Sequence, residues 1–182
     1  EQYFATVLNS IKNYPGKSSL FTEYPQYFES LLKMILTTRY SVRVKIIEIF
    51  KEILHDEITK ANYHFNPMEL MFSILNTEAS IDTEKTKINE LQKLQNLFRN
   101  KNMPLNLQRI YLRFIISLFW VKFTPLYSTV QKSIGELLSN YHDTLIDEFE
   151  SLLDTFDKLL EIGPNDQVLA KSLYPNLFDK SF

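Results

Sequence analysis

The sequence predicts an all-α protein, arranged as an α-solenoid of antiparallel helix pairs of the HEAT or armadillo kind. Three observations support this fold class. Apolar residues recur at intervals of three and four along most of the chain, which is the spacing of one helix face. No segment alternates cleanly with a period of two between turn signals, as a half-buried strand would. Only 3 of the 182 residues are Gly, so few positions suit the tight turns of β-hairpins.

The segment 105–138 gives the clearest helix pair. We expect its first helix at Leu105–Val121. Thr124 and Pro125 then indicate the start of a second helix at Pro125–Leu138. Thr124 is of a type that caps a first turn, and Pro suits the first helical position because no N–H is needed there. The first helix has an apolar face made of Leu107, Ile110, Tyr111, Phe114, Ile115, Leu118 and Phe119.

The other helices follow from the same period and from Pro, Gly, Ser and Asn near their ends. We expect them at Gln2–Ile11, Thr22–Leu36, Ser41–Leu54 with Ser41 as cap, Pro67–Leu75 after Asn66, Thr83–Phe98 and Asp143–Ile162. Gly163-Pro164 ends the last one, because Gly takes the left-handed position and Pro forbids continuation. The segment 56–64 is ambiguous, and Asp166–Leu173 is a short helical candidate. This makes about eight or nine helices.

Two helix pairs have the form of a repeating unit, namely 22–36 with 41–54 and 105–121 with 125–138. We therefore divide the chain into HEAT-like helical repeats at 1–163 and a C-terminal loop and short helix or tail at 164–182. The chain begins at Glu1 without an initiator Met, so we expect a fragment of a longer array. No shared repeat consensus is visible, and a closed globular helical domain remains the alternative.

Composition narrows the function classes. The 45% apolar and 14% aromatic content favours a packed interior, and the absence of Cys excludes disulfides and thiolate metal sites. The three Gly are isolated, so no phosphate-binding glycine loop is present. His55 has no second His at helical spacing, which disfavours a metal site. No apolar run reaches the length of a membrane span. We expect no enzyme, cofactor, metal, small-molecule substrate or membrane association.

Charge is unevenly distributed, although the net charge is only −2. The segment 84–132 holds nine basic and two acidic residues, and the segment 143–161 holds seven acidic and one basic residue. A basic ridge could bind phosphates with salt-dependent, sequence-independent affinity. The simpler interpretation is that these charged side chains only solvate the surface of a nearly neutral protein. Trp120 we expect to serve packing and not base stacking. The candidate contacts to RNA phosphates or a partner are Arg39, Arg43, Lys45, Arg109, Arg113 and Lys122.

A family resemblance centres on Phe119-Trp120-Val121-Lys122-Phe123-Thr124-Pro125-Leu126-Tyr127, in which Phe-Thr-Pro-Leu and an aromatic residue follow a long apolar helix. This segment resembles the DRIM ("down-regulated in metastasis") family, the very large HEAT-repeat proteins of the small-subunit processome, although the family pattern commonly has Trp where Tyr127 stands. Tyr14-Pro15-Gly16-Lys17-Ser18-Ser19-Leu20-Phe21 and Ser41-Val42-Arg43-Val44-Lys45 resemble further parts of that pattern. The likeness covers roughly residues 14–54 and 104–156.

The resemblance implies a structural scaffold in ribosome biogenesis, needed for pre-rRNA processing toward 18S rRNA and located in the nucleolus of the nucleus. Its partners would be other pre-ribosomal proteins, with pre-rRNA or U3 small nucleolar RNA of the U3 ribonucleoprotein as candidate RNA partners. The family supplies no catalytic residues. The alternative is a non-ribosomal HEAT-type adaptor of the transport or trafficking class, which binds only protein.

Overall fold

The computed structural model describes residues 2–36, 39–99, 102–121 and 123–161, and these residues form an all-α structure with no strand. The prediction of an all-α fold is confirmed. The ten α-helices of the described ranges are α1 (Gln2–Lys12), α2 (Leu20–Glu23), α3 (Pro25–Ile35), α4 (Tyr40–Ile53), α5 (His55–Ala61), α6 (Pro67–Asn76), α7 (Glu84–Phe98), α8 (Leu105–Ser117), α9 (Tyr127–Asn140) and α10 (His142–Glu161). Short 3-10 helices lie at Lys17–Ser19, Leu118–Trp120 and Thr124–Leu126.

Several helix ends differ from the predicted ones for local reasons. The expected helix 22–36 is split at Tyr24, because the residue before Pro25 is pushed out of the α region, and Tyr24 has φ −132° and ψ 68°. Ser41 does not cap α4, which begins one residue earlier with Arg39 at the N-cap position. Thr124 does not cap either, since it already lies inside a 3-10 helix whose N-cap is Phe123.

Asn66 forms a side-chain N-cap, which the helix starts near Ser41 and Thr124 lack. Its side-chain oxygen accepts hydrogen bonds from the backbone N–H groups of Met68 at 2.9 Å and Glu69 at 3.2 Å, and Pro67 occupies the first turn of α6. The ambiguous segment 56–64 contains all of α5 except its first residue, and the helix is followed by the C-cap Asn62 in the left-handed conformation with φ 50°. The predicted helix end at Gly163-Pro164 and the tail 164–182 lie outside the described residues.

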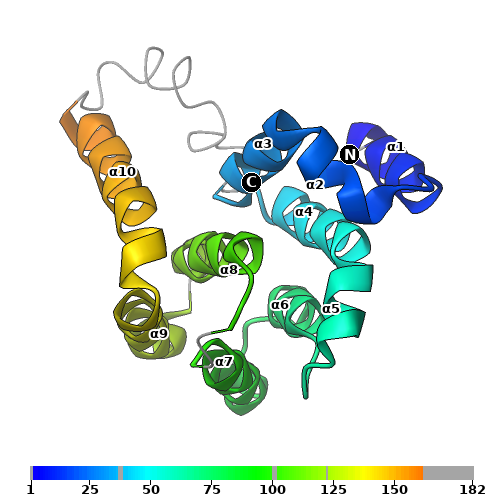
Figure 1. Ribbon diagram of the computed structural model, residues 1–182. Coiled ribbons are helices and arrows are strands. Elements are labelled where there is room, and N and C mark those ends of the chain that lie inside the picture. Colours follow the sequence, from blue (N-terminus) through cyan, green and yellow to red (C-terminus); the bar gives the residue numbers. More distant parts are fainter. Residues whose placement is uncertain (1, 37–38, 100–101, 122, 162–182) are drawn as a thin grey trace.

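Helix α8 lies among the other helices, as Figure 1 shows. It contacts α9, which follows it in sequence, and also α3, α10 and the 3-10 turn that continues it. Its buried residues fall on all sides of the helix and include polar ones: Leu107, Gln108, Ile110, Tyr111, Leu112, Arg113, Phe114, Ile115 and Ser117. A helix buried on every side is a core element, in contrast to one with a single apolar stripe.

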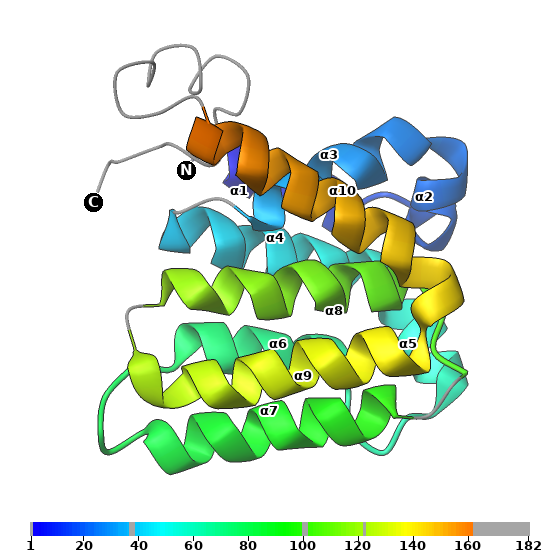
Figure 2. The same ribbon diagram turned by 90° about the vertical axis from the view of Figure 1, so that its left-hand side faces the viewer.

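Figure 2 shows α4, α6, α7, α8 and α9 lying nearly parallel or antiparallel to one another. The two pairs singled out in the sequence, α3 with α4 and α8 with α9, do pack against each other. Contacts also join helices that are distant in sequence, since α3 packs on α8 and α4 packs on α6. Figure 2 places the start of α4, the α6–α7 connection and the α8–α9 connection at one end of these helices, with α5 at the other.

Candidate functional site

The candidate cations lie in separate places. Arg109 and Arg113 are on α8, where they face α3 and α10. Arg39 and Arg43 lie at the start of α4, beside a different cleft. Lys45, on α4 as well, forms a surface ion pair with Glu48 at 2.8 Å. Lys122 lies outside the described residues.

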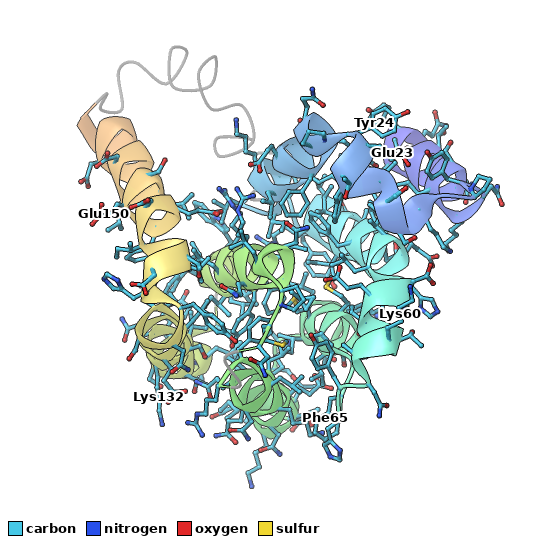
Figure 3. The ribbon with its side chains drawn as sticks, in the orientation of Figure 1. Glu23, Tyr24, Lys60, Phe65, Lys132 and Glu150 are labelled. Carbon is cyan, nitrogen blue, oxygen red and sulfur yellow. The ribbon has the colours of Figure 1, made fainter. Side chains whose placement is uncertain are left out.

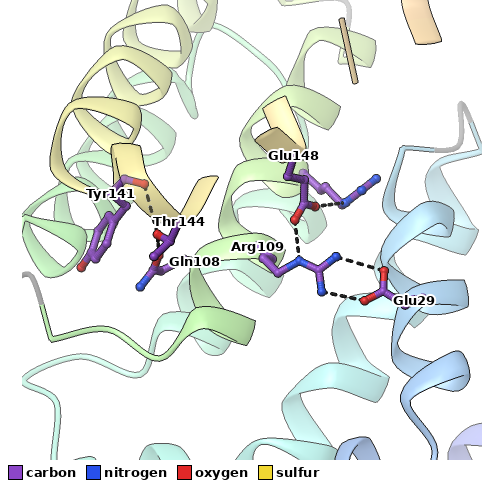
Figure 4. Close-up of polar contacts among 7 residues, drawn as sticks. Glu29, Gln108, Arg109, Tyr141, Thr144 and Glu148 are labelled. Carbon is purple, nitrogen blue, oxygen red and sulfur yellow. Dashed lines mark hydrogen bonds and ion pairs between the residues drawn. The ribbon is translucent and has the colours of Figure 1, made fainter. Parts of the chain in front are cut away.

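Arg109 and Arg113 take part in an ion-pair network that joins three helices (Figure 4). The two terminal nitrogens of Arg109 donate to the two carboxylate oxygens of Glu29 on α3, at 2.7 and 3.0 Å. Its Nε donates to Glu148 on α10, and Arg113 Nε donates to the other oxygen of Glu148 at 2.8 Å. The Arg109 guanidinium also lies over the ring of Phe28, 5.3 Å from its centre.

Burial disfavours the charge of Arg109, but the hydrogen bonds to Glu29 and Glu148 outweigh burial, so the pKa of Arg109 is raised. The hydrogen bonds from Arg109 lower the pKa of the Glu29 carboxyl, against partial desolvation. Both groups are therefore charged at neutral pH. The network pairs arginines of the basic 84–132 segment with a glutamate of the acidic 143–161 segment in the same molecule. A bound phosphate would have to compete with Glu29 and Glu148 for these arginines.

A second polar contact holds α10 at its start. Thr144 Oγ1 donates to Gln108 Oε1 at 2.8 Å and lies 3.1 Å from the Tyr141 carbonyl oxygen (Figure 4). Gln108 Nε2 donates to the Met103 carbonyl. Gln108 is buried, and this chain of bonds satisfies its amide at both ends. The first turn of α10 is thereby tied to the first turn of α8.

The other pair of arginines lines an open cleft of about 920 Å³. We call it the arginine cleft and define it by Arg39, Tyr40, Arg43, Glu78, Lys87 and Trp120, which line it together with backbone and apolar neighbours. Arg43 is 3% exposed. Burial lowers the pKa of Arg43 to about 10, so its guanidinium remains charged at neutral pH.

Three hydrogen bonds from side chains to backbone carbonyls hold the walls of the arginine cleft together. The Tyr40 hydroxyl donates to the Leu75 carbonyl at 2.8 Å and joins α4 to α6. Lys87 Nζ donates to the Ile74 carbonyl near the end of α6, while burial lowers the pKa of Lys87. Trp120 Nε1 donates to the Leu36 carbonyl at 3.1 Å and joins the α8–α9 turn to the end of α3. The cleft is therefore built from segments far apart in the sequence.

An apolar hollow of about 370 Å³ lies between α8, α9 and α10. Its walls are carbon-rich side chains, and Phe119, Trp120 and Leu153 are 37%, 39% and 46% exposed. Trp120 lines both this hollow and the arginine cleft. Trp120 is thus not part of the buried core of the described residues, and its expected role in packing between repeats stays a prediction.

Sequence reasoning missed Tyr40 and Lys87, which shape the arginine cleft, and Glu148, which holds the ion-pair network together. Lys87 sits among polar neighbours on a helix with a weak apolar stripe, so nothing in the sequence marks it as 2% exposed. The opposing charge of the two segments was visible in the sequence, but it did not single out Glu148 among the seven acidic residues of 143–161.

Among the described residues, no group of three or more His, Asp or Glu side chains is placed to hold a metal ion. None of the described helices is long and apolar enough to cross a membrane. No protein-family model matches the chain, no curated protein sequence shows significant similarity to it, and no solved structure matches its fold.

Proposed function

We propose that this chain is a non-catalytic structural segment of the small-subunit processome, built of HEAT-like helix pairs within a longer solenoid array. In this role it binds other pre-ribosomal proteins in the nucleolus and contributes to pre-rRNA processing toward 18S rRNA. Pre-rRNA and U3 small nucleolar RNA are its candidate RNA partners. The proposal rests first on the resemblance carried by the segment 119–127.

The geometry of that segment supports the resemblance. The rings of Phe119 and Tyr127 meet edge to face with centres 5.5 Å apart. The Tyr127 hydroxyl lies 3.4 Å from the Phe119 carbonyl oxygen and 3.3 Å from that of Val121, as a donor. Tyr and Trp both combine a large ring with one donor group, so Tyr127 suits a position at which the family commonly has Trp. The segment therefore has a folding role at the α8–α9 turn.

The use of polar side chains also supports a scaffold role. Arg109, Glu148 and Gln108 join helices to one another, and the walls of the arginine cleft are held by bonds to backbone carbonyls. Such groups fix the relative positions of helices, which is what a scaffold that presents surfaces to several partners requires.

The proposal is tested by recovery of the U3 RNA. The tagged chain is expressed in nucleolated cells, purified at moderate salt, and probed for U3 small nucleolar RNA and precursor small-subunit RNA. We expect both RNAs to be enriched over an untagged control and to sediment with the tagged chain as a large particle. A matched variant, Phe114→Ala, removes a fully buried ring, and its destabilised fold should reduce recovery of the particle. Absence of both RNAs from wild-type material would overturn the proposal.

The apolar hollow favours a second candidate, a HEAT-type adaptor of the transport or trafficking class. Exposed Phe119 and Trp120 are aromatic side chains of a kind enriched at protein interfaces, and exposed Leu153 adds apolar surface beside them. The same purification separates the two candidates, because the adaptor would be recovered with transport or trafficking proteins and without U3 RNA.

A further inference from the structure

The apolar hollow offers no free polar group to a ligand. The side chains that line it are Ile116, Phe119, Trp120, Ile134, Phe149, Leu152 and Leu153. Trp120 Nε1 is the one polar atom among these described side chains, and it already donates to the Leu36 carbonyl at 3.1 Å. Sites for small molecules orient their ligands with a few well-placed polar groups, so this hollow suits the apolar side chains of a protein instead.

The hollow belongs to the region where α9 and α10 diverge. Figure 2 shows these two helices separating from their connection, with α8 between them, and α10 packs on both α8 and α9. A partner strand could not extend this surface, because the described residues contain no sheet edge. An amphipathic helix that lays its apolar face into a groove between helices is the mode of recognition that fits.

A row of four carboxylates runs along α10 beside the hollow. We call it the acidic ridge and define it by Asp147, Glu150, Asp154 and Asp157, which follow one another at steps of three or four residues and so share a helix face. All four are exposed, and Figure 3 shows Glu150 on the side of α10 away from α8. Glu150 and Asp157 lie three residues before and four residues after Leu153, so they flank this wall of the hollow.

The charge of the acidic ridge is not compensated by the part of the chain that the structure describes. None of its four carboxylates forms an ion pair or a side-chain hydrogen bond there, whereas Glu148 on the inner side of α10 pairs with Arg109 and Arg113. Like charges three and four residues apart on a helix repel one another. Cations of a partner placed along the ridge would relieve this repulsion.

We propose that the apolar hollow and the acidic ridge together bind a basic amphipathic helix of another protein. The apolar side chains of that helix fill the hollow between α8, α9 and α10, and the Lys or Arg side chains next to them pair with the ridge. The apolar contacts supply most of the affinity, and the charges select a basic partner and speed its association. The proposal rests on the proposed function, in which the chain binds other proteins, and it names the surface and the chemical class of one partner.

The probe is a synthetic peptide of about 15 residues, or four helical turns, with Leu along one face, Lys on the others and no Trp. Trp120 is the sole Trp of the chain and lines the hollow, so its emission reports on filling of the hollow. We expect a saturable blue shift on titration of the complete chain, because the peptide displaces water from the indole. The anisotropy of labelled peptide should rise over the same concentration range.

Two control peptides separate shape from charge. The first has the same composition, but its Leu residues are spread around all faces of the helix. The second keeps the Leu face and carries Glu in place of every Lys. We expect both to bind much more weakly than the probe, the first because it has no apolar face and the second because the acidic ridge repels it.

Leu153→Gln changes a partly exposed wall of the hollow and should weaken binding of the probe about tenfold, through loss of apolar burial. Glu150→Gln should weaken it about threefold at low salt, and the difference should shrink as salt is added. The matched control is Glu57→Gln, which neutralises an exposed carboxylate on α5 and should bind like the wild type. Circular dichroism of each variant verifies that the helices are retained.

Absence of probe binding at low salt would overturn the proposal. Wild-type affinity in Leu153→Gln, or equal binding of the peptide with scattered Leu, would do the same, because binding would then depend on charge alone. Equal binding of the Glu peptide would exclude the acidic ridge as the basis of selection. A blue shift on concentrating the chain without peptide would identify a second copy as the occupant and would also overturn the proposal.

The U3 recovery separates these failures from a failure of the scaffold function. A chain that recovers U3 RNA and binds no probe would refute the helix-binding surface and leave the scaffold function standing. A chain that binds the probe with the expected variant effects, and recovers no U3 RNA, would refute the processome assignment and keep the surface.

Discussion

Arg113 of α8 donates to Glu148 of α10 at 2.8 Å, and the two side chains are only 10% and 13% exposed. The same carboxylate also accepts a hydrogen bond from Arg109, so one acidic residue compensates two guanidinium groups. Removal of a carboxylate shared in this way is strongly destabilising, because both arginines then lose a partner in a region with little water. The position of α10 on α8 therefore depends strongly on this one side chain.

Replacement of Glu148 by Gln tests this dependence. We expect the free energy of unfolding to fall by about 3 kcal/mol, the lower end of the cost of removing one partner from a buried ion pair, since Arg109 retains Glu29. Urea unfolding followed by circular dichroism gives the value. Glu150→Gln on the same helix is the control, because Glu150 is exposed on the side away from α8, and its effect should stay within about 0.5 kcal/mol (Figure 3). Equal losses in both variants would contradict the assignment.

The Glu29–Arg109 ion pair should make stability depend on acidity. Arg109 lowers the pKa of Glu29 in the folded chain, so the pair contributes fully above the unfolded value of about 4.3, and its contribution is lost as the pH falls through the lower folded value. Glu29→Gln should therefore show a smaller drop in melting temperature than the wild type between about pH 5 and pH 3. Added salt should reduce the difference. Identical pH profiles at low salt would show that the pair is not formed.

The packing of α8 and of the 3-10 helix that follows it can be tested by deletion of side-chain volume. Phe114 and Leu118 are 0% and 1% exposed, and Phe114→Ala or Leu118→Ala should each cost about 2–5 kcal/mol through cavity formation. Thermal and urea unfolding measure both. Phe119→Ala serves as the control, since Phe119 is 37% exposed and its removal should cost markedly less. Unchanged stability in both buried variants would refute the assigned core face.

The starts of α6 and α4 can be compared in the same assay. Asn66→Ala should destabilise the chain by about 1 kcal/mol, because the N–H groups of Met68 and Glu69 lose their acceptor. Ser41→Ala should be neutral or slightly stabilising, because Ser41 lies within α4, where Ala has the higher helix propensity. The reverse order of the two effects would restore Ser41 as a cap.

The helices of this chain were predictable because their apolar period is local information. The eight helices expected between residues 2 and 162 all have counterparts, and Pro67 and Pro125 do lie in first turns. The sequence could not show that α8 is covered on all sides, because periodicity reports one apolar face and says nothing of a polar residue such as Arg113 that is buried by a partner on α10.

The candidate site was predictable only in part. Arg39 and Arg43 were recognisable as a pair one turn apart, and they do share a cleft. The other walls come from the end of α6, from Lys87 on α7 and from Trp120 after α8, and no local pattern links these segments. The sequence left open whether Arg109 shares a face with Arg39 and Arg43. Its actual neighbours, Glu29 and Glu148, lie on α3 and α10, and local reasoning could not reach them.

Glu29 and Arg109 are 80 positions apart in the sequence, and the helices that carry them pack directly on each other. During translation, α3 and its neighbours leave the ribosome well before α8 does, so the apolar face that α8 will cover stays open until synthesis has passed Ser117. A chain with this contact pattern should therefore gain protease resistance in one late step and not helix pair by helix pair. Ribosomes stalled before and after α8 would carry nascent chains of very different stability, and the earlier ones would be the natural clients of chaperones.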